Sequence, residues 1–382
     1  MKILLVDIGT GTQDILLFDS RHDVENGYKL VLPSPTMIIN NRIRLATHDQ
    51  RPIVLTGVTM GGGPTSWATE NHIQAGLPVY ATQDAARTFN DDLDLVRKMG
   101  VQIIADDEII QLPKETLRLE LKDFDFELIR TTFEHFGVSL DTLAAVAVAV
   151  FDHGAAPTNV SDRQFRFDYL DARIRAENRL SAFAYTIDRI PKIMTRLQVV
   201  AETAINVPAP IVVMDTAPAA VLGANLDPIV MNRSRKLIAN IGNFHTLAFR
   251  LGPEGIEGVF EHHTGLVDKA SLEHYLKALA DGSLRNIDIF NTQGHGALVY
   301  SNNPLVLDRN DYNVTVTGPR RNLIQGSSLK PYFASPFGDM MIAGCFGLLA
   351  ATADVLPDLR EEIVSSLHGQ SGRGTPPWEA ID

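Results

Sequence analysis

The first turn of the sequence carries residue types that bind phosphate. The opening segment, MKILLVDIGTGTQDILLFD, has Asp7 at the end of an apolar run, then a Gly-Thr-Gly-Thr turn and a second apolar run. Successive backbone N–H groups in such a turn form an anion site, and glycine lets a ligand approach the backbone closely. We therefore predict that phosphate contacts Gly9, Thr10, Gly11 and Thr12.

Asp7 cannot bind phosphate itself, because two negative charges repel each other. Its predicted role is to hold Mg²⁺, directly or through water, so that the ion bridges to the phosphate groups. The plainer alternative is an ordinary hairpin turn next to a solvated aspartate.

The same arrangement returns in the second half of the chain. RKLIANIGNFHTLAFRL is again an apolar strand, a glycine turn and a second strand, and its predicted phosphate ligands are Gly242, Asn243 and Thr246. Each half ends with a helix of small residues, TAPAAVLGA in the first and AGCFGLLAA in the second. An internal repeat of this kind predicts two lobes of related fold.

Histidines and carboxylates occur at further predicted strand ends, in FDHG, EHHTG and GHG. Imidazoles beside carboxylates can bind a transition metal, but none of these pairs has the i, i+4 spacing of the strong zinc motifs. We therefore favour substrate contacts for Asp152, His153, His262 and His295, with structural histidines as the alternative. Gly61–Gly63, before a predicted helix, either cradles an anion or forms a flexible wall of the cleft.

Apolar runs and turn residues predict the elements that position these groups. The opening hairpin continues into a third strand at 28–32, and TLAAVAVAVFDHG predicts a buried central strand. Strand-like and helix-like segments alternate between these two strands, which predicts a large α/β insertion. The predicted organisation is a first lobe at 1–33 and 141–224, the insertion at 34–140, a second lobe at 225–367 and a mobile tail at 368–382.

Composition limits the class of protein. The 382 residues are 45% hydrophobic and 21% charged, as in globular proteins, and the formal net charge of -12 argues against nucleic acid and anionic membrane surfaces. The longest apolar run, from Leu143 to Phe151, is too short to span a membrane, and the N-terminal run is too short for a secretory signal. A single cysteine, Cys345, excludes a disulfide within the chain and fits a reducing compartment. We expect a cytoplasmic protein that binds neither nucleic acid nor membranes.

Five segments, in this order, resemble the superfamily of actin, the sugar kinases and the heat-shock chaperone ATPases. DIGTGTQD is similar to its first phosphate loop, VVMDTAPAAVLGANL to its connecting helix, NIGNFHTLAF to its second phosphate loop, VTVTGPRRN to its adenosine segment and DMMIAGCFGLLAA to its closing helix. The resemblance implies an α/β protein with two ribonuclease H-like lobes, the actin-like ATPase fold, around a central nucleotide cleft, with the α/β insertion in the first lobe.

More narrowly, the whole chain resembles a prokaryotic family described as "putative pyruvate formate-lyase activating enzyme". Glycyl-radical activating enzymes hold a 4Fe–4S cluster with three cysteines, and a chain with one cysteine cannot assemble such a cluster.

The superfamily resemblance implies ATP and Mg²⁺ as ligands, with Gly318 and Pro319 beside the adenosine. It also implies a role for Asp215, because sugar kinases use an aspartate here as the general base that takes the proton of the attacking hydroxyl group. Helix N-capping is an alternative role for Asp215 and is compatible with the first. Asn240 replaces the aspartate of chaperone-type second loops, which disfavours an ATPase of that type more than a kinase.

The predicted function is therefore an ATP-dependent phosphotransferase, a kinase that acts on a small metabolite. Two alternatives stay open: an ATP-binding switch that activates a protein partner, and a metal-dependent hydrolase that uses His and Asp side chains of the cleft. A homodimer is compatible with the sequence.

Overall fold

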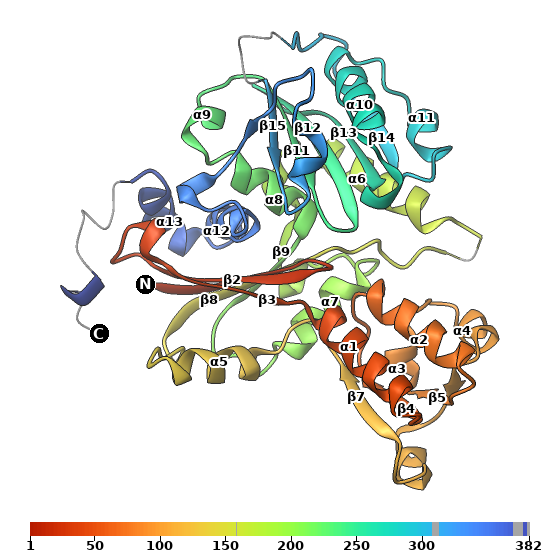
Figure 1. Ribbon diagram of the computed structural model, residues 1–382. Helices are drawn as coiled ribbons and strands as arrows, with labels where there is room; N and C mark the ends of the chain where they lie inside the picture. Colours follow the sequence, from red (N-terminus) through yellow and green to blue (C-terminus); the bar gives the residue numbers. More distant parts are fainter. Residues whose placement is uncertain (158, 308–312, 370–376, 380–382) are drawn as a thin grey trace.

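The two repeated segments form antiparallel hairpins that lie in two separate sheets. In the computed structural model, which describes residues 1–157, 159–307, 313–369 and 377–379, β1 (Lys2–Ile8) pairs with β2 (Thr12–Asp19). In the second half, β11 (Lys236–Ile241) pairs with β12 (His245–Gly252). Figure 1 shows one lobe built around each hairpin.

Both sheets follow one strand order. The first sheet runs β3-β2-β1-β8-β10-β9 and the second runs β14-β13-β12-β11-β15-β16. In each, three consecutive antiparallel strands are followed by two parallel ones, so both contain the order 3-2-1-4-5. This shared order confirms the predicted pair of ribonuclease H-like lobes. The remaining strands of the two sheets are β3 (Tyr28–Pro33), β8 (Leu143–Val150), β9 (Ala184–Thr186), β10 (Ile211–Asp215), β13 (Gly255–His263), β14 (Gly296–Val299), β15 (Val314–Thr317) and β16 (Tyr332–Phe333).

A third sheet carries the predicted insertion. Its four strands run β6-β5-β4-β7 and are all parallel, and they pack with α1 and α2 at one side of the first lobe (Figure 1). The buried apolar residues of this sheet form a cluster of their own. The strands are β4 (Ile53–Gly57), β5 (Val79–Ala81), β6 (Gln102–Ile103) and β7 (Leu117–Leu121).

Helices cover the sheets. They are α1 (Pro35–His48), α2 (Pro64–Gln74), α3 (Gln83–Ala86), α4 (Leu93–Met99), α5 (Phe126–His135), α6 (Asp162–Ala176), α7 (Thr195–Thr203), α8 (Thr216–Ala224), α9 (Pro228–Met231), α10 (Lys269–Asp281), α11 (Asn286–Phe290), α12 (Ala343–Val355) and α13 (Arg360–Leu367). Among the described residues, none of these helices combines the length and the apolar character that a transmembrane span needs.

The central strand β8 explains how α12 can lie close to the first sheet. Its alanines at 145, 147 and 149 face α12, whereas its valines at 146, 148 and 150 face the opposite side of the sheet. Because alternate residues of a strand point to opposite faces, the alanine face leaves room for a helix to lie close to the sheet.

The two helices of small residues cross between the lobes. A Cβ atom at Gly223 of α8 would overlap the backbone of Ala343, and one at Gly347 of α12 would overlap the backbone of Ala219. Only glycine permits this backbone contact, so the sequence of both helices fixes how closely they pack.

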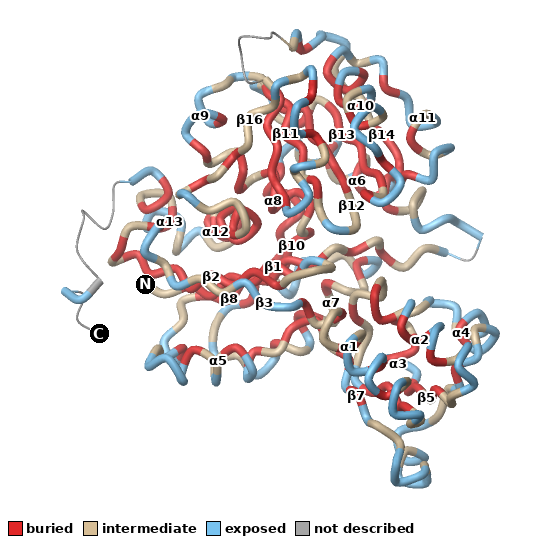
Figure 2. Tube along the Cα trace, in the orientation of Figure 1, coloured by how far each residue is buried: buried red, intermediate tan, exposed pale blue. Residues whose placement is uncertain are grey.

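The lobes share one core, and burial follows the sheets (Figure 2). The largest cluster of buried residues includes Val148 and Phe167 from the first lobe and Ile238 and Phe249 from the second. Residues of α5 also join this cluster, although they fall inside the predicted insertion at 34–140. The predicted domain boundaries stay a prediction, and most of the predicted tail, at 370–376 and 380–382, lies outside the described residues.

Candidate functional site

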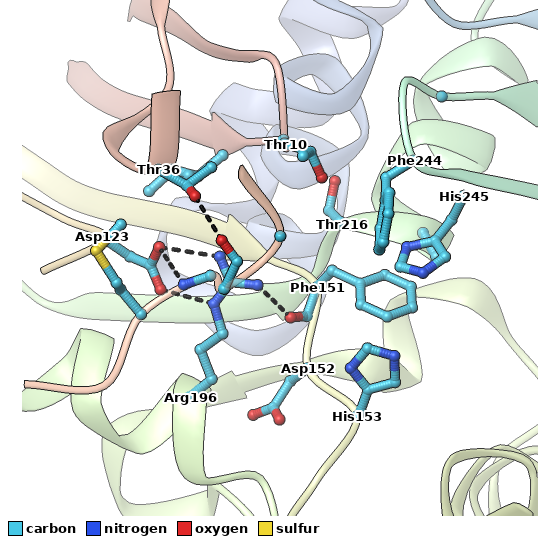
Figure 3. A pocket seen from close by; sticks show the side chains of 18 of the residues that line it. Thr10, Thr36, Asp123, Phe151, Asp152, His153, Arg196, Thr216, Phe244 and His245 are labelled. Atoms are coloured by element: carbon cyan, nitrogen blue, oxygen red, sulfur yellow. Dashed lines mark hydrogen bonds and ion pairs between the residues drawn. The ribbon is translucent and has the colours of Figure 1, made fainter. Parts of the chain in front are cut away.

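A cavity of about 1200 Å³ lies between the two lobes and the insertion. Both hairpin turns line it, together with the end of β8, the end of β15 and the N-terminal ends of α8 and α12. Figure 3 shows part of its wall, with Thr10 and Thr216 near the first turn and Phe244 and His245 from the second.

The two turns have the same backbone geometry and lie against each other. In the first, Gly9 N donates to Thr12 O at 2.9 Å, and in the second Gly242 N donates to His245 O at 2.9 Å. A Cβ atom at Gly11 would overlap the side-chain amide of Asn243, so the second turn closes directly on the first. The sequence repeat therefore ends in one shared site.

Most of the predicted phosphate ligands line this cavity; they are Gly9, Thr10, Gly11, Thr12, Gly242 and Asn243. Thr246 is not among the described residues that line it. Its side chain is buried, with Oγ1 2.9 Å from Thr264 Oγ1, and Thr264 Oγ1 in turn donates to Gly242 O at 2.9 Å. Thr246 thus supports the second turn from the interior.

Two buried carboxylates stand beside the first turn. Asp7 and Asp14 are direct partners in the register of β1 and β2, and both line the cavity. Asp7 Oδ1 accepts a hydrogen bond from Thr216 Oγ1 at 2.5 Å, whereas Asp14 Oδ1 finds no hydrogen-bond partner among the described residues. A Cβ atom at Gly344 would overlap Asp7 Oδ2, so glycine is needed where α12 meets this carboxylate.

This pair has the chemistry of a magnesium site. Burial and then the nearby Asp215 raise the pKa of Asp7 to about 6, and burial and then the charge of Asp7 raise the pKa of Asp14 to about 8. A hard divalent cation prefers carboxylate oxygens and would relieve the repulsion between them. The donor set and the unpartnered oxygen of Asp14 therefore fit Mg²⁺.

The predicted adenosine segment also reaches the cavity. Thr317, Gly318 and Pro319 line it at the end of β15. Gly318 has φ of 97°, and a Cβ atom there would overlap the Asn240 side chain, so both conformation and space require glycine.

The glycine-rich loop of the insertion forms another part of the wall. Gly61 N donates to Asp123 Oδ1 at 3.1 Å, and Gly62 O accepts a hydrogen bond from Thr36 Oγ1 at 2.7 Å. Asp123 also pairs with Arg196, whose Nε and Nη2 donate to its two oxygens at 2.6 and 2.9 Å (Figure 3). The loop is therefore tied to the first lobe through a buried carboxylate.

An aromatic contact joins the insertion to the second lobe. Trp67 on α2 meets Phe244 of the second turn edge to face, with ring centroids 5.7 Å apart, and Trp67 stays half exposed. The insertion and the second turn thus touch across the cavity.

Hydrogen bonds hold Asp215 at the start of α8. It is buried at the N-cap of α8, where its Oδ1 accepts from Ala217 N at 2.9 Å, and it is not among the described residues that line the cavity. Arg166 Nη1 donates to its Oδ2 at 2.7 Å. These contacts support the capping role, and the general-base role stays a prediction.

Arg166 also connects the two lobes. This fully buried side chain of α6 donates from Nε to Glu261 Oε2 of β13 at 2.9 Å. Its Nη1 also donates to Asp152 O at 2.8 Å. A single cation is therefore shared by two carboxylates from different lobes.

The predicted substrate residues divide into two groups. Asp152 and His153 line the cavity at the end of β8, although the carboxylate of Asp152 already accepts hydrogen bonds from Gly154 N and Leu197 N. His295 lies behind His153, with the two Nε2 atoms 3.1 Å apart. His262 points away, stacks on Tyr275 and contacts Thr292 Oγ1 at 3.1 Å.

Two further histidines lie where His262 was expected. His245 begins β12 and lines the cavity, and His263 at the end of β13 has its ring centroid 4.7 Å from that of His295. Burial is the first cause that lowers the pKa of each; it brings the pKa of His153 to about 3 and holds those of His245, His263 and His295 below their usual value. The imidazoles are therefore neutral near pH 7.

The duplicated lobes and the cavity between them define a protein of the actin-like ATPase fold. Within that class, the chain matches the family described as "Putative pyruvate format-lyase activating enzyme (DUF1786)" over residues 60–323, and it belongs to this family. Its one cysteine, Cys345, is buried on α12 with Sγ 3.1 Å from Asp14 O, so the chain offers no set of thiolates for an iron–sulfur cluster.

Two solved structures are similar along nearly the whole chain. One is the activator of the 2-hydroxyisocaproyl-CoA dehydratase from Clostridium difficile with bound ADPNP, with 8% identity, 100% of both chains covered and a TM-score of 0.33. The other is the ROK hexokinase from Thermus thermophilus, with 11% identity, 98% of this chain and 100% of that chain covered, and a TM-score of 0.28. No curated protein matches the chain.

Proposed function

We propose that this protein binds Mg-ATP between its two turns and transfers the terminal phosphoryl group to a small hydroxylated or carboxylated metabolite. The observation that carries the proposal is the meeting of two turns with the same hydrogen bond, beside a buried carboxylate pair, in one cavity. Backbone N–H groups and a cation are the two features that phosphoryl transfer needs from its site.

The phosphate end of the nucleotide would lie against Gly9–Thr12 and Gly242–Asn243. Asp7 and Asp14 would hold Mg²⁺, with Thr216 fixing the orientation of Asp7 through its 2.5 Å hydrogen bond. The bound ion would neutralise charge on the phosphate groups. The nucleoside would extend toward Thr317–Pro319.

The size of the cavity supports a second ligand. Pockets of roughly 300–1000 Å³ bury one drug-sized molecule, and this cavity is about 1200 Å³. The additional wall is formed by the insertion, including the glycine loop at 61–63 and the segment around Arg87 and Asp91. We place the phosphoryl acceptor on this side.

Asp215 can act as the general base only if its hydrogen bonds to Arg166 break. In the arrangement described, the carboxylate is held by Arg166 and by the N-terminus of α8. Because phosphoryl transfer depends mainly on positioning and electrostatic stabilisation, the reaction can proceed from a weakly activated hydroxyl group.

The occupied Asp215 also favours a second candidate function. A site that holds Mg-ATP while Arg166 holds Asp215 suits a switch, in which ATP binding moves the lobes and acts on a protein partner.

Steady-state ADP release with a panel of metabolites tests the proposal, because a kinase releases ADP only in proportion to an acceptor. Asp7→Asn should weaken Mg-ATP binding in calorimetry, whereas the exposed Asp358→Asn should not. Absence of any Mg-ATP binding by the wild type would overturn nucleotide binding. ADP release that no metabolite stimulates, together with ATP-dependent binding of another protein, would replace the kinase by the switch.

A further inference from the structure

We propose that His153, His245 and His295 form a binding site for a divalent transition metal, best matched by Zn²⁺, at the edge of the cavity. One nitrogen from each ring lies within 4.8 Å of the other two. The three residues come from the segment after β8, the start of β12 and the segment before β14, so both lobes contribute. The proposal goes beyond the proposed function and does not depend on it.

One of the distances between the rings matches a shared metal. His153 Nε2 and His295 Nε2 are 3.1 Å apart. Two nitrogens bound to one tetrahedral zinc, at Zn–N distances of about 2.0–2.1 Å, lie roughly 3.3 Å from each other. A hydrogen bond between the two imidazoles would explain this distance, but it would not explain why a nitrogen of His245 lies close to both.

The third ring has an unused nitrogen. His245 Nε2 is buried and has no hydrogen-bond partner within the described part of the chain. Burial of a nitrogen without a partner is unfavourable, and buried polar atoms are therefore nearly always paired. A metal ion that accepts its lone pair would supply the missing interaction.

A carboxylate stands behind one ligand, as in many metal sites. Glu261 Oε1 lies 3.4 Å from His295 Nδ1, and neither atom has a hydrogen-bond partner elsewhere among the described residues. A metal-bound histidine usually directs its second nitrogen to such a carboxylate, which fixes the tautomer and leaves the other nitrogen free for the metal. Arg166 holds the other oxygen of Glu261 at 2.9 Å and so orients it.

Packing holds the rings in place before any ion binds. Phe151 stacks on His245 with ring centroids 4.2 Å apart and an interplanar angle of 21°, and it meets His153 edge to face at 4.7 Å. The guanidinium of Arg166 lies over the Phe151 ring at 3.9 Å. Asp215 and Glu261 both contact Arg166 and offset its positive charge beside these rings.

The ligand set indicates both the metal and its use. Three neutral imidazoles are typical of zinc sites that keep one coordination position for water or substrate. His153 and His245 line the cavity, so a ligand in the cavity can reach a metal that they hold. We therefore expect the site to take an oxygen atom of water or of a small oxygen-bearing molecule.

Titration of the metal-free, full-length protein with Co²⁺ and Zn²⁺ tests the site without nucleotide. Wild type should bind one equivalent, and Co²⁺ should give the intense visible absorption of tetrahedral coordination, which Zn²⁺ removes. His153→Gln and His245→Gln should each weaken binding by more than the 10–100-fold that loss of an outer partner causes. His135→Gln, on the exposed surface of α5, is the control for adventitious binding and should bind like the wild type.

Melting temperatures in EDTA show whether each variant folds. If a variant does not fold, the titration of the wild type still tests the metal site. A wild type that binds no stoichiometric Co²⁺, or binds it without tetrahedral absorption, overturns the proposal. Folded His153→Gln and His245→Gln variants with wild-type affinity overturn it as well. Since ATP is absent throughout, failure here leaves nucleotide binding untouched.

Discussion

Replacing Asp14 by asparagine should stabilise the metal-free protein near pH 8 while removing its response to magnesium. The pKa of Asp14 rises from 3.8 to about 8 because the group is buried and faces Asp7. Between these values the folded state keeps a proton that the unfolded state has lost, so stability falls as pH rises through this window. A shift of about four pH units corresponds to on the order of 5 kcal/mol.

Urea unfolding in EDTA at pH 5, 6.5 and 8 measures this dependence. The free energy of unfolding of the wild type should fall across the series, and that of Asp14→Asn should fall much less. Magnesium should stabilise the wild type most at pH 8, because a ligand that binds only the folded state raises its stability, and it should not stabilise Asp14→Asn. Asp358→Asn, at an exposed position, should behave like the wild type. Equal pH slopes for the wild type and Asp14→Asn would refute the reasoning.

Three further predictions concern the residues around the cavity. Arg166→Met should lower the free energy of unfolding by about 3–5 kcal/mol, because it removes the cation that two buried carboxylates share. A loss under about 1 kcal/mol in urea unfolding would contradict the shared ion pair. Asp215→Asn should keep the helix cap and the affinity for ATP. Turnover should fall by about 10²–10⁴-fold only if Asp215 is the general base. Full turnover of this variant in a coupled ADP assay would exclude that role. Gly11→Val should force the turn away from Asn243 and weaken Mg-ATP binding in calorimetry. The expected loss is about tenfold or more, or at least about 1.4 kcal/mol. Unchanged affinity would show that the two turns do not hold the phosphates together.

The fold was predictable where pairing is local. Each hairpin joins strands that are neighbours in the sequence, so apolar runs around a glycine turn were enough to predict β1–β2 and β11–β12. The long-range partner β8 was also recognisable, because a strand buried on both faces is continuously apolar. The packing of α5 on the shared core was not predictable from the sequence, because the apolar stripe of this helix fits either the insertion or the first lobe.

The candidate site was predictable only in its turns. Asp14 was missed although it stands opposite Asp7 in the hairpin, and the equal spacing of the two residues from the turn was the signal. Adjacent residues of a strand face opposite ways. His262 was the one predicted from the sequence, whereas His263 is the one whose ring lies beside His295. Which of the two histidines faces the first lobe depends on the orientation of β13 in the folded protein, and the sequence of one strand does not determine that orientation.

Arg166 shows a different limit of the sequence. An arginine in a helix with many charged residues reads as solvent-exposed, yet its side chain is fully buried. The reason is that Asp215 and Glu261 reach it from two other elements, and no local pattern contains that information.

The contact between Trp67 and Phe244 gives the protein a built-in optical reporter. The chain contains two tryptophans, and the other, Trp378, is largely exposed, so Trp378→Phe would leave Trp67 as the single indole emitter. The indole lies half in solvent at the point where the insertion meets the second turn. A rotation of the insertion relative to the second lobe would change the solvation of the Trp67 indole, and the wavelength of its emission would report that movement.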